Sequence, residues 1–263
     1  MNLKKTYPSD LTNEEFDYIK DLIPDAKPGG RPRTLVIREV LNAIFYITKG
    51  GVQWRMLPSD YPKWNSVYNY FRAWKLDGTW IRIHDALRAQ VREQEGRHKH
   101  PTAGSLDSQS VKTTEVGTAE TGFDSGKKVK GRKRHLMVDT IGLLVIVVVS
   151  AASVSDQGGA QQVFKRMRGI CKKLRKIWVD GTYRGVDWTD WVKEKYRITL
   201  EWIRREEGQT GFAVLPRRWV VERTLGWLNL SRRLSKDYER LPESSETFVY
   251  LAMTRLMLKR LAS

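Results

Sequence analysis

Residues 134–150 read RHLMVDTIGLLVIVVVS, two apolar runs separated by the short connection Thr140-Ile141-Gly142. Strand-length apolar runs joined through a glycine are typical of a β-hairpin. Residues 104–111 upstream also have a strand pattern, and helical and strand patterns alternate downstream. The expected order is strand 104–111, strands 134–139 and 143–150, helix 157–173, strand 177–180, helix 186–196, strand 198–203, helix 219–234 and helix 246–261. Asp156 is the expected N-cap of helix 157–173. This order predicts an α/β fold with a mixed five-stranded sheet flanked by helices.

The first part of the chain has a different pattern. Thr12 and Glu15 form a capping-box sequence, and apolar residues then recur at helical spacing. Further helices are expected over 34–49, 64–77 and from 79 onward, and the polar stretch 94–102 separates them from the first strand. We therefore predict an all-helical, helix-turn-helix-like domain over residues 1–96 and an α/β catalytic domain over residues 97–263.

Composition limits the classes of function. The 263 residues carry 47 Lys+Arg against 30 Asp+Glu, a net charge of +17, which favours a polyanionic partner such as nucleic acid. The single cysteine, Cys171, excludes an intramolecular disulfide and a cysteine-rich zinc site. The longest apolar run, 143–149, is too short to cross a bilayer, and residues 1–20 lack an apolar signal segment. A cytoplasmic protein that makes no membrane contact is expected.

Three carboxylates are candidates for catalysis. Asp107 lies in an expected strand, Asp180 ends the next apolar run, and Glu222 lies in the expected helix 219–234. Two aspartates on strands and a glutamate on a helix suit a site that holds two Mg²⁺ ions for phosphodiester chemistry, because Mg²⁺ prefers carboxylate oxygens. Asp107 would bridge both ions, while Asp180 and Glu222 would each bind one. A single acid in such a position is more often a turn, cap or solvated residue, so the prediction depends on all three together.

The helix around Glu222 supports a site that contacts DNA. At about 100° per residue, Arg218, Glu222, Asn229 and Arg233 fall on one face. Arginines beside a metal-binding acid suit phosphate contacts.

Other basic and polar residues are candidate DNA contacts. The densest basic run, 127–135, leads into the hairpin strand and predicts a phosphate-binding edge, although a solvated loop is the alternative. The helix 64–77 would enter a major groove, although its aromatic residues would also serve as core, and residues 31–33 would form a minor-groove arm. The full set is Arg31, Arg33, Lys63, Asn65, Asn69, Arg72, Lys128, Lys130, Arg132, Lys133, Arg134, His135, Arg184, Arg218, Arg223, Arg232 and Arg233.

Four motifs together resemble the DDE transposases of bacterial insertion sequences, in the group with a short, helix-free gap between catalytic motifs. They are LDSQSVK at 106–112, GRKRHL at 131–136, VDGTY at 179–183 and WVVERT at 219–224, the last followed by WL at 227–228 and RRL at 232–234. The resemblance covers almost the whole chain and implies a ribonuclease H-like fold with Asp107, Asp180 and Glu222 as the catalytic triad. Related transposases often carry a Tyr seven residues before the Glu, an Arg four before it and a Lys or Arg seven after it. Only Arg218 matches, since the other positions hold Leu215 and Asn229; Arg232 or Arg233 could supply the missing charge.

The resemblance also implies a mechanism and partners. A metal-activated water cuts at an element end and frees a 3′-OH, which then attacks a target phosphodiester without ATP or a covalent protein–DNA intermediate. The implied cofactor is two Mg²⁺ ions, with Mn²⁺ as a substitute. The implied partners are double-stranded DNA, as terminal inverted repeats and target, and a second copy of the chain in a homodimer near the bacterial nucleoid. Two alternatives remain: a metal-dependent, structure-specific nuclease of the same fold, such as a junction resolvase, and a catalytically inactive DNA-binding regulator.

Overall fold

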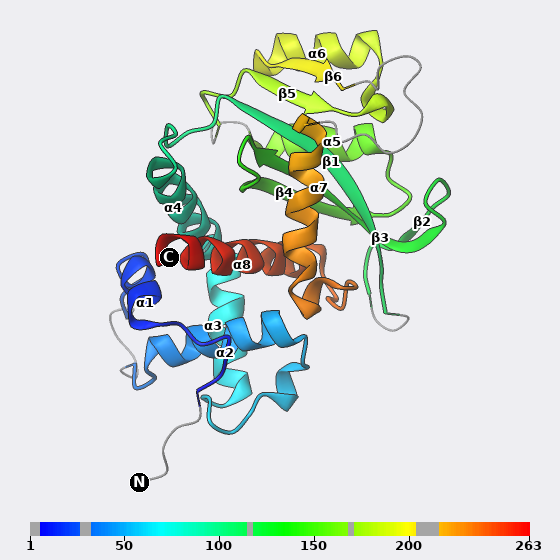
Figure 1. Ribbon diagram of the computed structural model, residues 1–263. Coiled ribbons are helices and arrows are strands. Elements are labelled where there is room, and N and C mark those ends of the chain that lie inside the picture. The colour runs from blue at the N-terminus through cyan, green and yellow to red at the C-terminus, as the bar shows by residue number, and fades with distance from the viewer. Residues whose placement is uncertain (1–5, 27–32, 115–117, 168–170, 204–215) are drawn as a thin grey trace. The chain divides into compact units, whose positions relative to one another are not determined.

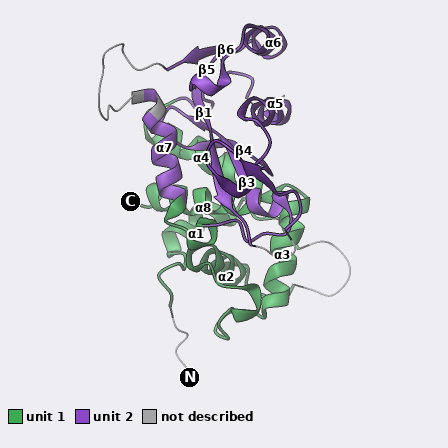
Figure 2. Ribbon diagram, turned by 90° about the vertical axis from the view of Figure 1, so that its right-hand side faces the viewer, with its two compact units in different colours: residues 1–97, 229–235, 247–263 green, residues 98–228, 236–246 purple. Residues whose placement is uncertain are grey.

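The computed structural model describes residues 6–26, 33–114, 118–167, 171–203 and 216–263. The chain divides into two compact units, coloured separately in Figure 2. Unit 1 contains residues 1–97, 229–235 and 247–263, and unit 2 contains residues 98–228 and 236–246.

Unit 2 is built on a mixed β-sheet (Figure 1). Its strands are β1 (Ala103–Lys112), β2 (Gly122–Asp124), β3 (Val129–Asp139), β4 (Leu144–Ala151), β5 (Lys176–Val179) and β6 (Thr199–Trp202). β3 pairs antiparallel with β1 on one edge and with β4 and β2 on the other, while β5 is parallel to both β1 and β6. The predicted mixed sheet of five strands flanked by helices, the ribonuclease H-like arrangement, is confirmed. The additional strand β2 was not expected, because three residues without an apolar run give no strand signal.

One face of the sheet is covered by two helices, α5 (Asp156–Met167) and α6 (Val186–Tyr196). Leu106 of β1 and Ile177 of β5 belong to the same buried cluster as Phe164 of α5. The Phe164 ring also meets Trp188 of α6, with 5.7 Å between the ring centroids. Apolar burial on this face therefore fixes which side chains of β1 and β5 point inward.

Helix α7 (Pro216–Asn229) contacts the sheet through its first and middle turns. The Ser105 hydroxyl of β1 donates to the Arg217 carbonyl oxygen (2.9 Å), and the Thr224 hydroxyl donates to the Gly142 carbonyl oxygen (2.7 Å). Gly142 has φ 86°, and a Cβ there would lie 2.9 Å from the Trp227 ring. The hairpin turn therefore needs glycine both for its backbone and for the approach of α7.

Several expected helix boundaries were wrong. Helix α5 ends at Met167 and not near residue 173. The helix starting near residue 219 ends at Asn229 and not at Leu234, and a separate 3₁₀ turn, η3 (Arg232–Leu234), follows. Arg233 therefore does not continue the helical face of Glu222. Asp156 was expected to cap α5, but the Ser155 hydroxyl accepts from the Gly158 N–H (3.1 Å), and Asp156 is the first helical residue. Serine is an equally good cap, and Asp156 has partners on the sheet.

Unit 1 is helical, as predicted. It contains α1 (Asn13–Lys20), α2 (Ile37–Gly50), η1 (Trp54–Met56), α3 (Trp64–Leu76), α4 (Thr79–Gln94) and most of α8 (Pro242–Leu261). The predicted capping box is present, since the Thr12 hydroxyl accepts from the Glu15 N–H and the Glu15 carboxylate accepts from the Thr12 N–H.

The sequence-based domain division placed residues 97–263 together, whereas the structure places residues 247–263 in unit 1. Phe248 of α8 stacks on Phe71 of α3, with 5.0 Å between the centroids. The Arg255 guanidinium of α8 forms a buried ion pair with Glu15 of α1. These contacts join α8 to the N-terminal helices because its apolar side chains complete their core. Among the described residues, no helix is long and apolar enough to span a membrane.

A buried arginine holds the segment around residue 237 against the sheet of unit 2. The Arg132 side chain of β3 is fully buried and lies 3.3 Å from the Asp237 carboxylate, which is also fully buried. The same guanidinium donates to the carbonyl oxygens of Ala119, Glu239 and Arg240. A buried charge is tolerated only when paired and hydrogen-bonded, and Arg132 meets both conditions.

Replacing this arginine tests its structural role. Arg132→Met should lower the free energy of unfolding by about 3–5 kcal/mol, since it leaves a buried carboxylate without its partner. Lys130→Met, on the same strand at an exposed position, should change it by less than about 0.5 kcal/mol. Urea unfolding followed by tryptophan fluorescence measures both, and equal midpoints for the two variants would contradict the assigned role.

Candidate active site

The strand register brings two of the predicted acids together. In the parallel pairing of β1 with β5, Gly104 lies opposite Ile177 and Ser105 opposite Trp178. The offset of 73 residues, 178 − 105, is the same as the separation of Asp107 from Asp180, the residue that follows β5, so the register continued by two residues places Asp180 beside Asp107. Both side chains are half-buried.

The two aspartates share the sheet face that does not carry the α5–α6 core. Leu106 and Val179 point into that core, and side chains alternate along a strand, so Asp107 and Asp180 point to the other side. Ser105 lies two residues before Asp107, and Trp178 lies two residues before Asp180, so both side chains point to the same side as the aspartates. Arg217 at the start of α7 contacts both Ser105 and Trp178. The Arg217 guanidinium carbon lies 4.4 Å from the Trp178 ring centroid. The face of the aspartates is therefore also the face that α7 contacts.

Asp180 is held by the turn that follows it. It is the N-cap residue of the 3₁₀ helix η2 (Gly181–Tyr183), and its Oδ1 accepts from both the Thr182 N–H (2.9 Å) and the Thr182 hydroxyl (2.5 Å). In the described structure both bonds fall on Oδ1, so Oδ2 remains a potential metal ligand. The side chain is thereby oriented before any ligand binds.

Tyr183 is buried beside this pair. Burial raises the pKa of the Tyr183 phenol well above its ordinary value, and the charges of Asp107, Asp156 and Asp180 raise it further. Tyr183 therefore stays neutral throughout the physiological range.

The third predicted acid is not part of this group. Glu222 is exposed, whereas Val221, Thr224 and Leu228 form the buried side of α7. Within the described ranges, no three His, Cys, Asp or Glu residues lie close enough to hold a metal ion. The carboxylate pair Asp107–Asp180 nevertheless has the hard oxygen donors that a divalent cation such as Mg²⁺ prefers. The pair fits a divalent cation, and the role of Glu222 remains a prediction.

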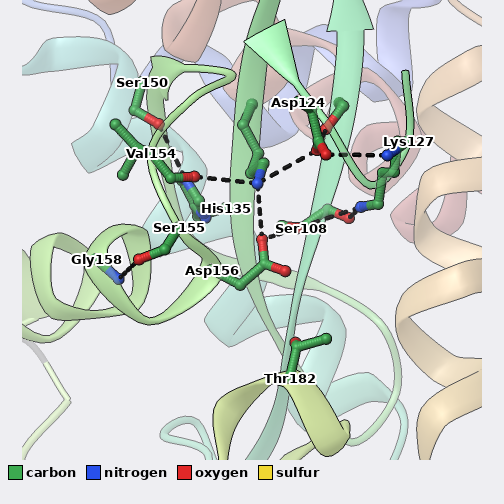
Figure 3. A network of polar contacts seen from close by, with 12 residues as sticks. Ser108, Asp124, Lys127, His135, Ser150, Val154, Ser155, Asp156, Gly158 and Thr182 are labelled. Carbon is green, nitrogen blue, oxygen red and sulfur yellow. Dashed lines mark hydrogen bonds and ion pairs between the residues drawn. The ribbon is translucent and has the colours of Figure 1, made fainter. Parts of the chain in front are cut away.

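A polar network that the sequence did not reveal lies on the opposite face of β1 (Figure 3). The Lys133 ammonium lies 3.1 Å from Asp156 and 3.3 Å from Asp124, and it donates to the Val154 carbonyl oxygen. The Ser108 hydroxyl, next to Asp107 in sequence, donates to Asp156 (2.7 Å). Burial alone would raise the pKa of Asp156, but the hydrogen bonds from Ser108 and Lys133 outweigh it, and the pKa is lowered. Asp156 therefore remains ionised and fixes the strand beside Asp107.

His135 borders this network and is completely buried. Its Nε2 lies 2.9 Å from the Ser150 hydroxyl, and its ring leaves no space for a Cβ at Gly159 of α5. Burial lowers the pKa of His135 to about 4, and nearby Lys133 and Lys127 oppose the small raising effect of Asp156. The imidazole is therefore neutral at physiological pH.

This shift predicts an acid sensitivity of the fold. The unfolded chain takes up a proton at His135 near pH 6.5 but the folded chain only near pH 4, so folding loses stability as pH falls between these values. From pH 7 to pH 5 the loss due to His135 should be about 2 kcal/mol. Urea unfolding at both pH values should show a smaller loss for His135→Gln than for the wild type. An identical loss in the variant would exclude His135 as the cause.

The structure separates the candidate DNA contacts into exposed and buried groups. Lys63, Asn65, Asn69, Arg72, Lys128, Lys130, Arg184 and Arg232 are exposed. Arg132, Lys133, Arg134, His135 and Arg233 are buried. The Arg233 guanidinium packs on the Phe248 ring and donates to the Val52 carbonyl oxygen. The buried residues hold the fold together, so we do not carry them into the proposed DNA surface.

The four remaining candidates belong to neither group. Arg223 is half-buried and lies over the rings of both Trp219 (4.8 Å) and Trp227 (4.6 Å). Arg33 is half-buried and donates to the Pro24 carbonyl oxygen (3.0 Å). Arg31 and the side chain of Arg218 lie outside the described residues.

Helix α3 has the amphipathic character expected of a DNA-reading helix. Val67, Phe71 and Trp74 are buried, so the alternative role of its aromatic residues as core is correct for these positions. Asn65, Asn69 and Arg72 are exposed and recur at helical spacing, which places them on one outward face. Both interpretations of this helix therefore hold, on opposite faces.

The ribonuclease H-like fold is one that polynucleotidyl transferases use, and comparison with known families places the chain among them. A family described as "Transposase DDE domain" matches residues 98–257, and one described as "Putative transposase of IS4/5 family (DUF4096)" matches residues 11–84. The chain belongs to the DDE transposases, a family of enzymes that act on DNA and depend on divalent metal ions.

A curated relative supports this membership. The "Insertion element IS402 uncharacterized 16.2 kDa protein" of Burkholderia cepacia is 28% identical over 113 residues, which cover 41% of this chain and 76% of that protein. No solved structure matches the chain.

Proposed function

We propose that this transposase cuts the ends of an insertion element and joins the freed 3′-OH to target DNA at one active site. The observation that carries the proposal is the parallel pairing of β1 with β5, whose register, continued by two residues, sets Asp180 at the end of β5 beside Asp107. Neighbouring strand ends are where a ribonuclease H-like sheet gathers its acids, and the family match covers both of them.

We infer that Asp107 and Asp180 hold two Mg²⁺ ions, for which Mn²⁺ can substitute, and that Glu222 contributes from α7. When bound, these ions supply Lewis-acid stabilisation to the attacking and leaving oxygens of an in-line displacement. The chain's own residues orient the site. Thr182 fixes Asp180, and Ser108 together with Asp156 fixes the strand that carries Asp107.

Two buried side chains near the acid pair cannot take part in phosphate binding as cations. Tyr183 and His135 are both buried and uncharged at physiological pH, so neither adds charge to the phosphate-binding face. We therefore assign phosphate binding to exposed cations, among them Lys128, Lys130 and Arg184.

Recognition of the element ends is assigned to unit 1. The outward face of α3, with Lys63 just before it, presents two amides and two cations, a set suited to base edges and phosphates in a major groove. Transposition joins two ends of one element to the target, so we propose that two copies of the chain act together on the terminal inverted repeats.

Substitution of each acid tests the catalytic proposal. Asp107→Asn, Asp180→Asn and Glu222→Gln should each lower strand cleavage by about three orders of magnitude or more, because metal-dependent stabilisation of the reacting oxygens is lost. DNA binding should survive. Asp187→Asn, an exposed position on α6, is the matched control and should retain activity.

The readout is cleavage and joining of labelled element-end DNA with Mg²⁺ and then with EDTA. Metal-dependent cleavage without joining would replace the transposase by a nuclease of the same fold. Binding with neither activity would leave a DNA-binding regulator. Normal cleavage by two of the three acid variants would remove the assigned triad.

Variants on α3 test the recognition surface in the full-length chain. Asn69→Ala should weaken binding to element ends by about 1–3 kcal/mol and relax specificity, as expected for a lost base contact. Arg72→Ala should reduce the slope of log K against log salt concentration by about 1, as expected for a lost phosphate contact. Lys20→Ala, an exposed cation on α1, should do neither, and gel-shift titration over a salt series measures all three. An unchanged affinity for Asn69→Ala and Arg72→Ala would place the recognition surface elsewhere.

A further inference from the structure

A basic groove in unit 2, about 680 Å³ in volume, lies where β1 leaves the sheet and the β2–β3 hairpin begins. Phe123, Lys128, Lys130, Lys112 and several threonines line it, and none of the described lining residues carries a carboxylate. The Phe123 side chain is 56% exposed, more than any other aromatic side chain among the described residues. Phosphate binding is already assigned to Lys128 and Lys130, but it gives no role to the exposed ring beside them.

The strand register places two lining residues, Phe123 and Lys130, on the catalytic face, whereas Lys112, five residues from Asp107, points to the other side of β1 at the strand end. Phe123 pairs with Lys130 across β2 and β3, so their side chains share one face. On β3, Lys130 and Leu136 are an even number of residues apart, so their side chains point to the same side of the sheet. Leu136 pairs with Asp107 on β1. The Phe123 ring and the Asp107 carboxylate therefore point to the same side of the sheet.

The distance between the groove and Asp107 follows from strand geometry. Five residues separate Asp107 from Lys112 on β1, which is about 17 Å at about 3.3 Å per residue. Stacked nucleotides rise about 3.4 Å each along one strand, so this distance corresponds to about five nucleotides. The two sites are thus spaced to engage one DNA strand.

The lining favours nucleotides whose bases are unpaired. Ammonium groups attract phosphates, and an exposed aromatic ring stacks on a base face without regard to sequence. Bases in a duplex have their faces covered by neighbouring pairs, so they are not accessible to Phe123. A volume of this size is that of a small-molecule site and admits one or two nucleotides rather than a double helix.

The groove wall is fixed in advance. The buried Asp124 carboxylate accepts from the Lys127 N–H (3.0 Å) and the Ser110 hydroxyl (2.5 Å) and lies 3.3 Å from the Lys133 ammonium. Hydrogen bonds from Ser110 and the Lys127 N–H, with the charge of Lys133, hold the pKa of Asp124 well below its usual range. Because hydrogen bonds hold the hairpin that carries Phe123 against β1, binding a ligand costs little conformational entropy in the hairpin.

We propose that this groove binds unpaired nucleotides of the DNA strand, about five nucleotides from the scissile phosphate, with Phe123 stacked on a base and Lys128 and Lys130 on the adjoining phosphates. The proposal rests on the proposed function for the position of the scissile phosphate at Asp107. The binding of unpaired nucleotides itself does not depend on catalysis.

Binding in EDTA tests the groove without cleavage. The probes are a fluorescent duplex of about 20 base pairs with a single-stranded extension of about five thymidines, and the same duplex with blunt ends. The wild type should bind the extended probe about tenfold more tightly, the range expected for base–aromatic stacking. Phe123→Ala should abolish the preference, and Phe123→Tyr should retain it. Val186→Ala, another exposed apolar residue of unit 2, is the control and should not change it.

The lysines have a separate readout. Lys128→Ala combined with Lys130→Ala should lower the salt slope for the extended probe by about 1.4, since each single-strand phosphate contact contributes about 0.7. Equal wild-type affinity for both probes, or a preference that survives in Phe123→Ala, would overturn the proposal.

Cleavage and joining assays then separate the two proposals. A wild-type preference for the extended probe, lost in Phe123→Ala, together with no metal-dependent cleavage would support the groove and reject the transposition chemistry. Cleavage and joining without any preference would reject the groove alone. An abasic nucleotide moved along the extension should abolish the preference only where Phe123 stacks.

Discussion

The parallel pairing of β1 with β5 is the constraint on which the site depends. Its register, continued by two residues, sets Asp180 beside Asp107 and, because side chains alternate, turns both away from the α5–α6 core. A slip of one residue in either strand would bury one aspartate among apolar side chains and expose a core residue. Burial of Leu106 and Ile177 therefore fixes the register and, with it, the position of the two acids.

Buried cations hold the surroundings of this pair. Arg132 ties the segment around Asp237 to β3, and Lys133 ties Asp124 and Asp156 to the strand beside Asp107. These residues come from the most basic stretch of the sequence, yet their charges are paired with carboxylates inside the fold. The exposed cations of the same stretch, Lys128 and Lys130, are the ones left for a polyanion. The density of basic residues along the chain thus identifies a region that can bind carboxylates or phosphates, but it does not tell which of its side chains are exposed.

The acid pair and the Phe123 ring face the same side of one sheet. The antiparallel ladder between β1 and β3 is the rigid connection between them, and Asp124 anchors the hairpin at its far end. A strand of DNA that follows β1 would meet both. Glu222 is different, because it comes from α7 and lies on the exposed side of that helix. The site therefore has one part preset by strand pairing and one that depends on how α7 is placed.

Most of the strand and helix order and the helical N-terminal part could be predicted from the sequence, because periodic burial and local capping depend on neighbouring residues. The catalytic role of the three acids stays a prediction, although β1 and β5, which carry or precede Asp107 and Asp180, do pair in the sheet. Three outcomes required the folded structure. Helix α8 belongs to unit 1 because Phe248 packs on Phe71, 177 residues away in the sequence (248 − 71). Asp156 is held by Ser108 and Lys133 of the sheet, which leaves the cap of α5 to Ser155. Arg132, Arg134 and His135 are core residues because of the side of the sheet that each faces, which no local pattern encodes.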